Sequence, residues 1–311
     1  MRGILRWLLS SAVLVLVVSA LTFVLVSLTP GDAARSILGA SGTEAQHEQL
    51  RHQLGLDRPL WTRYGEWLNG VLHGDLGTSL FTGQPVSAAL NERLGVTLTL
   101  IVGSMVVAIA VGGGLGLLSA VRGGRIGRTV DVFSLLGLAI PNFWLGLVLV
   151  AVFAVALRVF PTGGYVAMTQ SPAGWLGSIV LPVVTLGFGA SAMLAKQSRD
   201  AVLDELGKDY VVMLRARAVG ERSVILRHVL KNAAVPIVTV LGLLFVGLLG
   251  GSVFVETLFV LPGLGSTVVQ ATTTHDIPMV QGVALYFTVI VVAVNLVVEL
   301  TYRKLNHRSG T

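Results

Sequence analysis

Few residue patterns in this sequence could carry out chemistry. The phosphate-binding pattern GxxxxGK[ST] is absent, and the densest glycine cluster, Gly112-Gly113-Gly114-Leu115-Gly116, lacks the required lysine. The hydrolase patterns HExxH and GxSxG are absent too. We therefore predict no catalytic residue in this chain. Any ATP that its function needs must be bound by another subunit.

Metal ligands are also poorly supplied. The 311 residues include six histidines and no cysteine. His47 and His52 are five residues apart, whereas two ligands on one helical face need a spacing of four. We predict no metal site and no cofactor bound by this chain itself.

Ionisable residues inside apolar segments can mark a proton or ion path. The candidates here lie near segment ends, where Asp131 can pair with Arg128 and Glu299 can pair with Arg303 on one helical face. We interpret both carboxylates as structural. A proton-coupled carrier would need carboxylates nearer the middle of the membrane.

The elements that position these residues must lie in a bilayer. Hydrophobic residues make up 53% of the chain and charged residues only 12%, with a mean hydropathy of +0.80. The net charge of +6 does not indicate nucleic-acid binding, because the basic residues are spread beside apolar segments.

Membrane-spanning helices need about 20 apolar residues. Six stretches qualify: 7–28, 96–120, 132–157, 177–198, 234–255 and 281–302. The first is too long for a cleaved signal and is interpreted as a retained helix. Pro141 and Pro182 fall inside the third and fourth, where neighbouring helices can satisfy the freed backbone groups.

Basic residues set the expected orientation. The segments 1–6, 121–128, 196–231 and 303–308 hold 16 of the 22 Lys and Arg residues. Short cytoplasmic loops retain positive charge, so both termini are predicted to face the cytoplasm of a cell with this chain in its inner membrane.

The predicted extracytoplasmic insertion, 29–93, is too long to be a simple connection. Trp61, Tyr64 and Trp67 recur at a spacing of three, which predicts one aromatic helical face. This face is either a cap resting at the lipid headgroups or a docking surface for a partner.

The predicted cytoplasmic loop 199–232 reads as two short helices. Asp209 is predicted to cap the first, Val211, Leu214 and Ala218 to form its apolar face, and Gly220 to end it. This loop either rests on anionic lipid or docks a cytoplasmic protein.

The segment from Glu256 to Gly265 follows the fifth span. Its Pro262-Gly263 pair predicts a turn, and the apolar run before it could dip back into the bundle. A gate element and a plain buried turn are both consistent with this pattern.

Several motifs resemble one family of membrane proteins. Ala216-Arg217-Ala218-Val219-Gly220 and Leu226-Arg227-His228 through Pro236 resemble the EAA loop of ABC-importer permeases, in the first-permease form of the dipeptide/oligopeptide/nickel family. Further matches lie along nearly the whole chain: Leu28-Thr29-Pro30-Gly31-Asp32, Leu54-Gly55-Leu56-Asp57-Arg58-Pro59, His73-Gly74-Asp75-Leu76-Gly77-Thr78-Ser79, Pro141-Asn142-Phe143-Trp144-Leu145-Gly146, Phe160-Pro161-Thr162-Gly163-Gly164 and Pro262-Gly263-Leu264-Gly265.

The resemblance implies a type I importer. Its expected partners are a homologous second permease, two cytoplasmic ABC ATPases that bind ATP and Mg, an extracytoplasmic substrate-binding protein and the lipid bilayer, with no nucleic acid. The ATPase-coupling residues it implies are Asp209, Ala216, Arg217, Ala218, Gly220, Glu221 and Arg222. Glu256, Phe259, Pro262, Gly263 and Gly265 become candidates for an outer gate, and Trp61, Tyr64 and Trp67 for docking of the binding protein.

The sequence departs from the family pattern at three places. The stretch between Gly220 and Arg227 is shorter, which places the details of ATPase contact in question. His275 replaces a frequent arginine, and the C-terminus ends in Leu305-Asn306-His307-Arg308 instead of the common Asp-Pro-Arg.

The combined prediction is an all-α membrane protein of about six spans. Its parts are the helix 1–28, the insertion 29–93, the permease core 94–303 with the coupling loop 199–232, and the tail 304–311. The expected function is import of di- or oligopeptides, or of a related solute such as a nickel complex or haem, powered by partner ATPases. The alternatives are an ion-coupled secondary carrier and, more distantly, a membrane enzyme.

Overall fold

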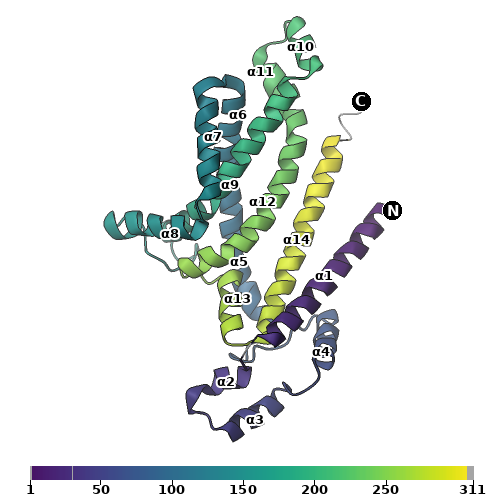
Figure 1. Ribbon diagram of the computed structural model, residues 1–311, viewed down its shortest axis with the longest axis vertical. Helices are drawn as coiled ribbons and strands as arrows, with labels where there is room; N and C mark the ends of the chain where they lie inside the picture. The colour runs from purple at the N-terminus through teal and green to yellow at the C-terminus, as the bar shows by residue number, and fades with distance from the viewer. Residues whose placement is uncertain (1, 30, 307–311) are drawn as a thin grey trace. The chain divides into compact units, whose positions relative to one another are not determined.

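The computed structural model describes residues 2–29 and 31–306, which are almost entirely α-helical (Figure 1). No β-strand forms among them apart from one isolated bridge between Thr78 and Pro85. The chain divides into two units. The first holds residues up to 97 together with 262–292, and the second holds 98–261 and the segment from 293 onward. The predicted all-α class is confirmed.

The first unit joins the N-terminal helix, the insertion and the segment after residue 261. Val86 and Leu90 of α5 pack against Val280 and Val283 of α14 in its core. Its helices are α1 (Arg2–Leu28), α2 (Ala33–Leu38), α3 (Glu44–Gln53), α4 (Leu60–Leu72), the first part of α5 (Val86–Val107), α13 (Leu264–Thr273) and the first part of α14 (Ile277–Asn306).

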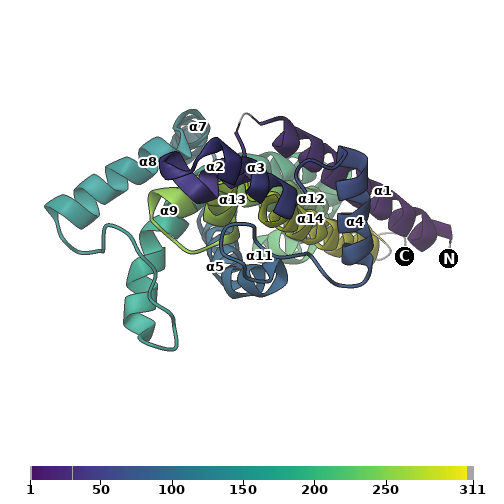
Figure 2. The same ribbon diagram turned by 90° about the horizontal axis from the view of Figure 1, so that it is seen from below.

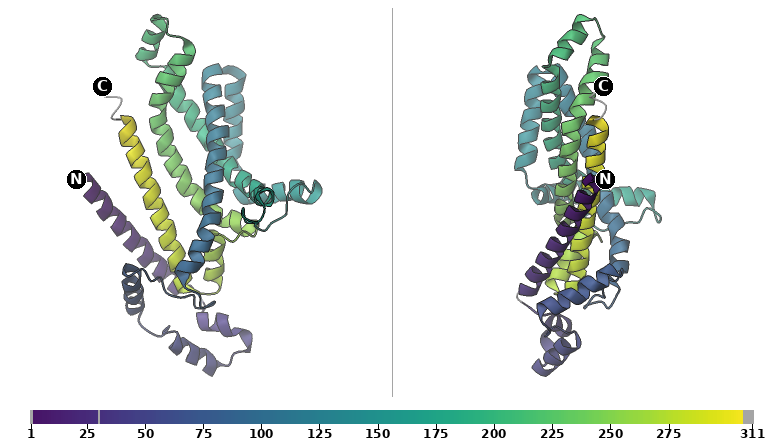
Figure 3. Two further views of the ribbon diagram at one scale, coloured as in Figure 1. Left: turned by 180° about the vertical axis from the view of Figure 1, so that it is seen from behind. Right: turned by 90° about the vertical axis from the view of Figure 1, so that its right-hand side faces the viewer.

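The second unit is a helical bundle around α9. Its helices are the rest of α5, α6 (Gly114–Arg122), α7 (Gly124–Ala139), α8 (Asn142–Leu149), α9 (Pro172–Leu206), α10 (Asp209–Ala216), α11 (Glu221–Ser223), α12 (Leu230–Leu258) and the rest of α14. Three π-helical turns, Ala108–Gly113, Val150–Ala156 and Val224–Val229, continue α5 into α6, extend α8 and lead into α12. The α6–α7 turn and the α10–α11 segment lie at the same end of this unit (Figures 1 and 3).

Five described helices are long and apolar enough to cross a membrane, or six if one bent pair counts as a span. They extend beyond the predicted stretches: residues 86–122 form one continuous helix, as do 172–206 and 221–258. Helical hydrogen bonding continues into polar residues at both ends, whereas the apolar count locates only the part that fits the bilayer.

The predicted third span, 132–157, is broken. α7 and α8 meet at an angle of 98°, and α8 runs out sideways from the end of α7 (Figures 1 and 2). Ile140, the residue before Pro141, has an extended backbone (ψ 119°). A proline disfavours helical geometry in the residue before it and lacks the N–H that would continue the ladder, so the helix ends there.

Close helix packing depends on Gly112 and Gly116, which are four residues apart. A Cβ at Gly112 would lie 2.4 Å from the Ser191 carbonyl oxygen, and one at Gly116 would lie 2.6 Å from that of Ala195. The backbones of α6 and of the π-helical turn before it therefore approach α9 more closely than any larger residue would allow.

Two predicted ion pairs have different outcomes. Glu299 accepts from Arg303 at 2.7 Å, as expected. Asp131 instead accepts from Arg199 of α9 at 2.6 Å, so the predicted pair with Arg128 is wrong. Asp131 joins two helices because α7 packs along α9, a contact that spacing along one helix cannot reveal.

Pro30 of the Leu28–Asp32 motif and residues 307–311 of the predicted tail lie outside the described residues.

Candidate functional site

The segment between α9 and α12 forms a helical projection anchored by buried valines. Val211 of α10 is fully buried and packs with Val202 of α9 and with Val224 and Val229. Asp209 is the first helical residue, while Lys208 holds the capping position without a side-chain cap, so the predicted cap at Asp209 is wrong.

A polar cluster fixes the base of α10. Glu205, only 8% exposed, accepts hydrogen bonds from the Lys208 ammonium and from the Tyr210 hydroxyl, the latter at 2.8 Å. The Tyr210 hydroxyl accepts in turn from Asn232 Nδ2 at 3.2 Å. Burial, and then the neighbouring Glu205, raises the pKa of Tyr210. The cluster ties α9, α10 and α12 together through hydrogen bonds to a charged group, which are among the stronger kind.

The turn after α10 differs from its prediction at two residues. α10 ends at Ala216, and the left-handed backbone falls on Ala218 (φ 54°). Gly220 has φ −57° and ψ 139°, values open to any residue, and a Cβ there would meet nothing within 4 Å. Gly220 therefore does not end the helix through glycine geometry. Ala218 is exposed and is not part of the buried face; Val219 packs there instead.

The outer surface of α10 is mixed apolar and basic. Val212 is 62% exposed and Met213 is 55% exposed, and Ala216 and Arg217, each four residues further on, are exposed as well. Val212 and Met213 were not predicted as site residues. The sequence does indicate their exposure. Val211, Val212 and Met213 are consecutive apolar residues, and consecutive residues of a helix cannot all lie on one face, so some of them must be exposed.

Charges around the turn are partly paired. Arg215 donates from Nε to Glu221 at 3.1 Å and bridges α10 and α11, and this hydrogen bond raises the pKa of Arg215. Such an exposed pair contributes little to stability, because water and salt screen it. Arg217 and Arg222 make no ion pair with any described residue, so their charges are free to meet a partner.

The gate candidates fall in both units. Glu256 lies inside α12, fully buried, and not in the turn after the span; Phe259 is 1% exposed, and the following Val260 has φ 53°. The Gly164 N–H donates to the Phe259 carbonyl at 2.8 Å. Pro262, Gly263 and Gly265 belong to the first unit, where the Leu264 N–H, at the start of α13, donates to Thr97 at 2.8 Å.

A cavity in the second unit is lined by α7, α8, α9 and α12. Its volume is about 350 Å³, and Asn142 supplies the one polar side chain among its described lining residues. Gly189 and Gly247 also line it, and a Cβ at Gly189 would lie 3.4 Å from Asn142 Oδ1. Asn142 follows Pro141, so the break in the third span places this amide inside the bundle.

The aromatic residues of α4 do not share one face. Tyr64 packs on α1, where its hydroxyl lies 2.9 Å from Ser19 Oγ and its ring 5.5 Å from that of Phe23. Trp67 stacks on Tyr64 with centroids 6.0 Å apart. Trp61 is 78% exposed, because a spacing of six residues rotates it away from Trp67.

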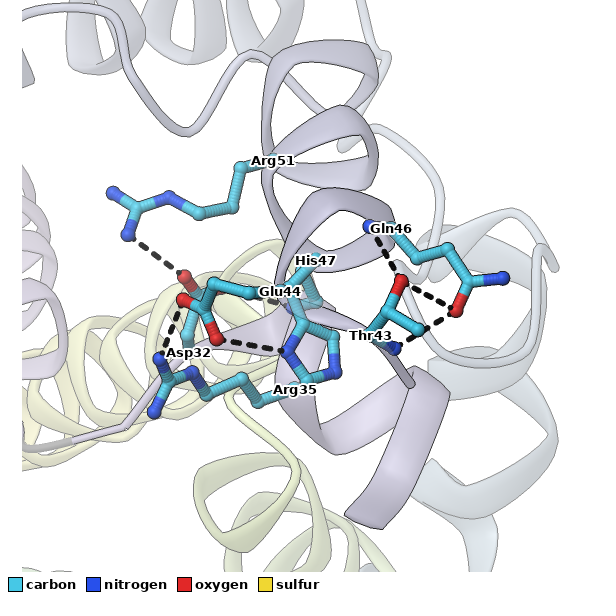
Figure 4. Close-up of polar contacts among 8 residues, drawn as sticks. Asp32, Arg35, Thr43, Glu44, Gln46, His47 and Arg51 are labelled. Atoms are coloured by element: carbon cyan, nitrogen blue, oxygen red, sulfur yellow. Dashed lines mark hydrogen bonds and ion pairs between the residues drawn. The ribbon is translucent and has the colours of Figure 1, made fainter. Parts of the chain in front are cut away.

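Ion pairs hold the insertion together (Figure 4). Asp32 caps α2 through the Ala34 N–H and lies 3.2 Å from Arg51 of α3, and Arg35 reaches Glu44 at 3.0 Å. His52 lies 2.9 Å from Asp57, whose pKa is lowered first by a backbone hydrogen bond and then by that histidine. No group of three or more metal-ligating side chains occurs among the described residues.

Three sequence motifs meet around the turn before α14. Asp276, 3% exposed, accepts from Ser79 and from the Leu80 N–H, the latter at 3.1 Å. The His275 ring lies so close to Gly31 that a Cβ there would be 2.1 Å from Nε2. The motifs around Gly31, Ser79 and Asp276 therefore form one structural cluster.

Two family models match the chain. One, described as "Binding-protein-dependent transport system inner membrane component", matches residues 112–310, and the other, "Binding-prot-dependent transport system membrane comp, N-term", matches residues 1–101.

Similar proteins share most of their length with this chain. A putative peptide transport system permease protein of Brucella abortus (strain 2308) is 40% identical over 92% of each chain. A glutathione transport system permease protein of Pectobacterium atrosepticum is 40% identical, with 94% of this chain and 93% of the relative covered. A probable D,D-dipeptide transport system permease protein of Escherichia coli (strain K12) is 36% identical, with 96% and 95% covered.

A solved structure shares the fold. A chain from the inward-facing MetNI methionine ABC transporter matches with a TM-score of 0.55 and 18% identity, covering 70% of this chain and 97% of that chain. At this identity the likeness concerns the fold alone.

Proposed function

The chain belongs to the family of binding-protein-dependent transport system inner membrane components and is the permease of an ABC importer, and from this premise we propose that it carries peptides into the cell. The names of the relatives support peptides, since they include a peptide, a D,D-dipeptide and a glutathione system. No described feature favours an ion-coupled carrier.

The observation that carries the coupling mechanism is the exposed surface of α10. Val212 and Met213 present apolar area to water at the tip of a braced projection, with Arg217 beside them. An exposed apolar surface with a basic rim is typical of a protein contact. We assign this surface to one of two partner ATPases, which bind ATP and Mg. The other coupling candidates, Asp209, Ala216, Ala218, Gly220, Glu221 and Arg222, shape or border this surface.

We propose the remaining partners from the family to which the chain belongs. A second, homologous permease would complete the pathway, and Asn142 would line this chain's part of it. A binding protein would deliver peptide outside the cell, where Trp61 is the aromatic residue of α4 most open to it. Tyr64 and Trp67 would contribute indirectly, because they hold α4 against α1. Glu256 and Phe259 with Pro262, Gly263 and Gly265 stay candidates for the outer gate, and both termini would face the cytoplasm.

Peptide transport is tested by reconstituting the chain with its partner subunits in liposomes. We expect uptake of labelled di- or oligopeptides. This uptake should require ATP on the side of the membrane where the ATPases dock and the binding protein on the opposite side. Uptake of another solute with no competition by peptides would contradict the proposed substrate. Uptake driven by an ion gradient without the ATPases would contradict the importer mechanism.

A further inference from the structure

A further cavity in the second unit lies next to the proposed coupling surface and shares Arg222 with it. It has a volume of about 490 Å³ and is lined by α6 and by the first turns leading into α12. Its lining residues are Gly114, Leu117, Leu118, Val121, Arg122, Arg222, Ile225 and Leu226. We call it the Arg122–Arg222 groove.

The groove combines an apolar floor with two cations. Leu118, Val121 and Leu226 are 38%, 44% and 60% exposed, so their side chains face an open space and not a packed core. Arg122 and Arg222 are exposed and form no ion pair with any described residue. The apolar residues belong to helices apolar enough to cross a membrane, and the arginines lie where those helices end or begin.

We propose that this groove binds an anionic phospholipid, with an acyl chain along Leu118 and Leu226 and the phosphate between Arg122 and Arg222. Basic pockets between spans at the cytoplasmic face suit such headgroups, and long arginine side chains reach the interface from helix ends. A docked ATPase could contact Arg222. The apolar residues of the groove, however, belong to membrane-spanning helices, where lipid can reach them. The proposal rests on membrane insertion of these helices and not on the identity of the transported substrate.

A bound lipid here would touch the segment that leads to α10. Arg222 lies in α11, directly after the turn that carries Ala218, and Ile225 belongs to the π-helical turn that continues into α12. Occupancy of the groove would therefore brace the base of the coupling projection against α6.

The test measures lipid retained by the full-length chain after extraction from nanodiscs of phosphatidylcholine and phosphatidylglycerol in equal amounts. Native mass spectrometry counts each lipid. We expect preferential retention of phosphatidylglycerol, and about a 30-fold loss of that preference in Arg122→Gln/Arg222→Gln, equal to about 2 kcal/mol for two cations. The matched control, Arg125→Gln/Arg128→Gln, removes two arginines of the same region that do not line the groove and should keep the preference.

A second pair of variants tests the acyl chain. Gly114 lines the groove and has open space around it, so Gly114→Leu should fill the floor and lower retention of both lipids. Gly113→Leu also enters open space but lines no part of the groove, and should retain lipid. Displacement of the lipid by inorganic phosphate alone would overturn the acyl-chain assignment. The proposal would be overturned if the two double arginine variants retained phosphatidylglycerol equally. It would also be overturned if Arg122→Gln/Arg222→Gln lost co-purifying ATPase without any change in bound lipid.

Discussion

Ala218, and not Gly220, is the residue whose backbone shapes the turn beyond α10. Its φ of 54° lies in the left-handed region, which costs a residue with a Cβ roughly 1–2 kcal/mol. The partly buried Val219 next to it and the Arg215–Glu221 pair across the turn hold it there. The turn is thus maintained by contacts on both sides and not by an intrinsic preference of the sequence.

Substitutions at these two positions should therefore differ. Ala218→Val adds a β-branched side chain to a left-handed residue and should weaken the turn by about 1–2 kcal/mol, whereas Gly220→Val should have no effect on the isolated chain. Hydrogen exchange of the α10 amides should accelerate about tenfold or more in the first variant only. Equal acceleration in both variants would show that Gly220 carries the turn after all.

Tyr210 holds α10 at its base through two hydrogen bonds. Tyr210→Phe should remove both and leave the buried Glu205 with one partner fewer, at a cost of about 1–3 kcal/mol to the order of α10. The amide exchange of residues 209–216 should report this, with Tyr286→Phe as the control. Tyr286 likewise has a hydroxyl hydrogen bond, to Asn91, but lies in the other unit.

The same tyrosine predicts a pH response. Its pKa is raised in the folded chain, so its contribution to stability is complete below the ordinary tyrosine pKa of about 10 and is lost as pH rises through the higher folded value. We expect protection of α10 to show no Tyr210-dependent change between about pH 6 and pH 9. A wild-type transition in that window that is absent from Tyr210→Phe would contradict this assignment.

At the scale of elements, the bundle is organised by the approach of α6 to α9. Gly116→Val would drive a side chain into the Ala195 carbonyl, whereas Gly113→Val enters open space in the same helical run. Overpacking of this kind typically costs about 1–3 kcal/mol. We expect a lower thermal midpoint in detergent for Gly116→Val than for Gly113→Val. Matching midpoints would show that α6 and α9 can separate freely.

Several elements could be predicted from the sequence because a spanning helix needs only an apolar stretch of sufficient length. The angle at Pro141 could not, since a proline indicates that a helix ends and not where the next one points. The contact between Asp131 and Arg199 depends on how α7 packs along α9, which spacing along the chain does not encode. The exposure of Val212 and Met213 likewise depends on which residue of α10 is buried, and Val211 fills that place.

At the scale of the whole molecule, the distribution of Lys and Arg predicts the sides of the membrane. Thr43 and Arg125 are both exposed, and the chain has no native cysteine to compete with a label. Thr43→Cys should react with an impermeant thiol reagent from outside intact spheroplasts, and Arg125→Cys only after the membrane is opened. Labelling of both from outside would contradict the proposed topology.

The most direct test of the account concerns the coupling surface of α10. In proteoliposomes that contain the partner subunits, Val212→Asp/Met213→Asp should leave the permease inserted but abolish substrate-stimulated ATP hydrolysis and reduce ATPase co-purification at least tenfold. Burying two carboxylates in an apolar contact is strongly unfavourable. Leu72→Asp, which alters a residue 77% exposed on the insertion, should leave co-purification unchanged. Retention of both ATPase binding and stimulated hydrolysis by the α10 double variant would contradict the assignment of this surface to the ATPase.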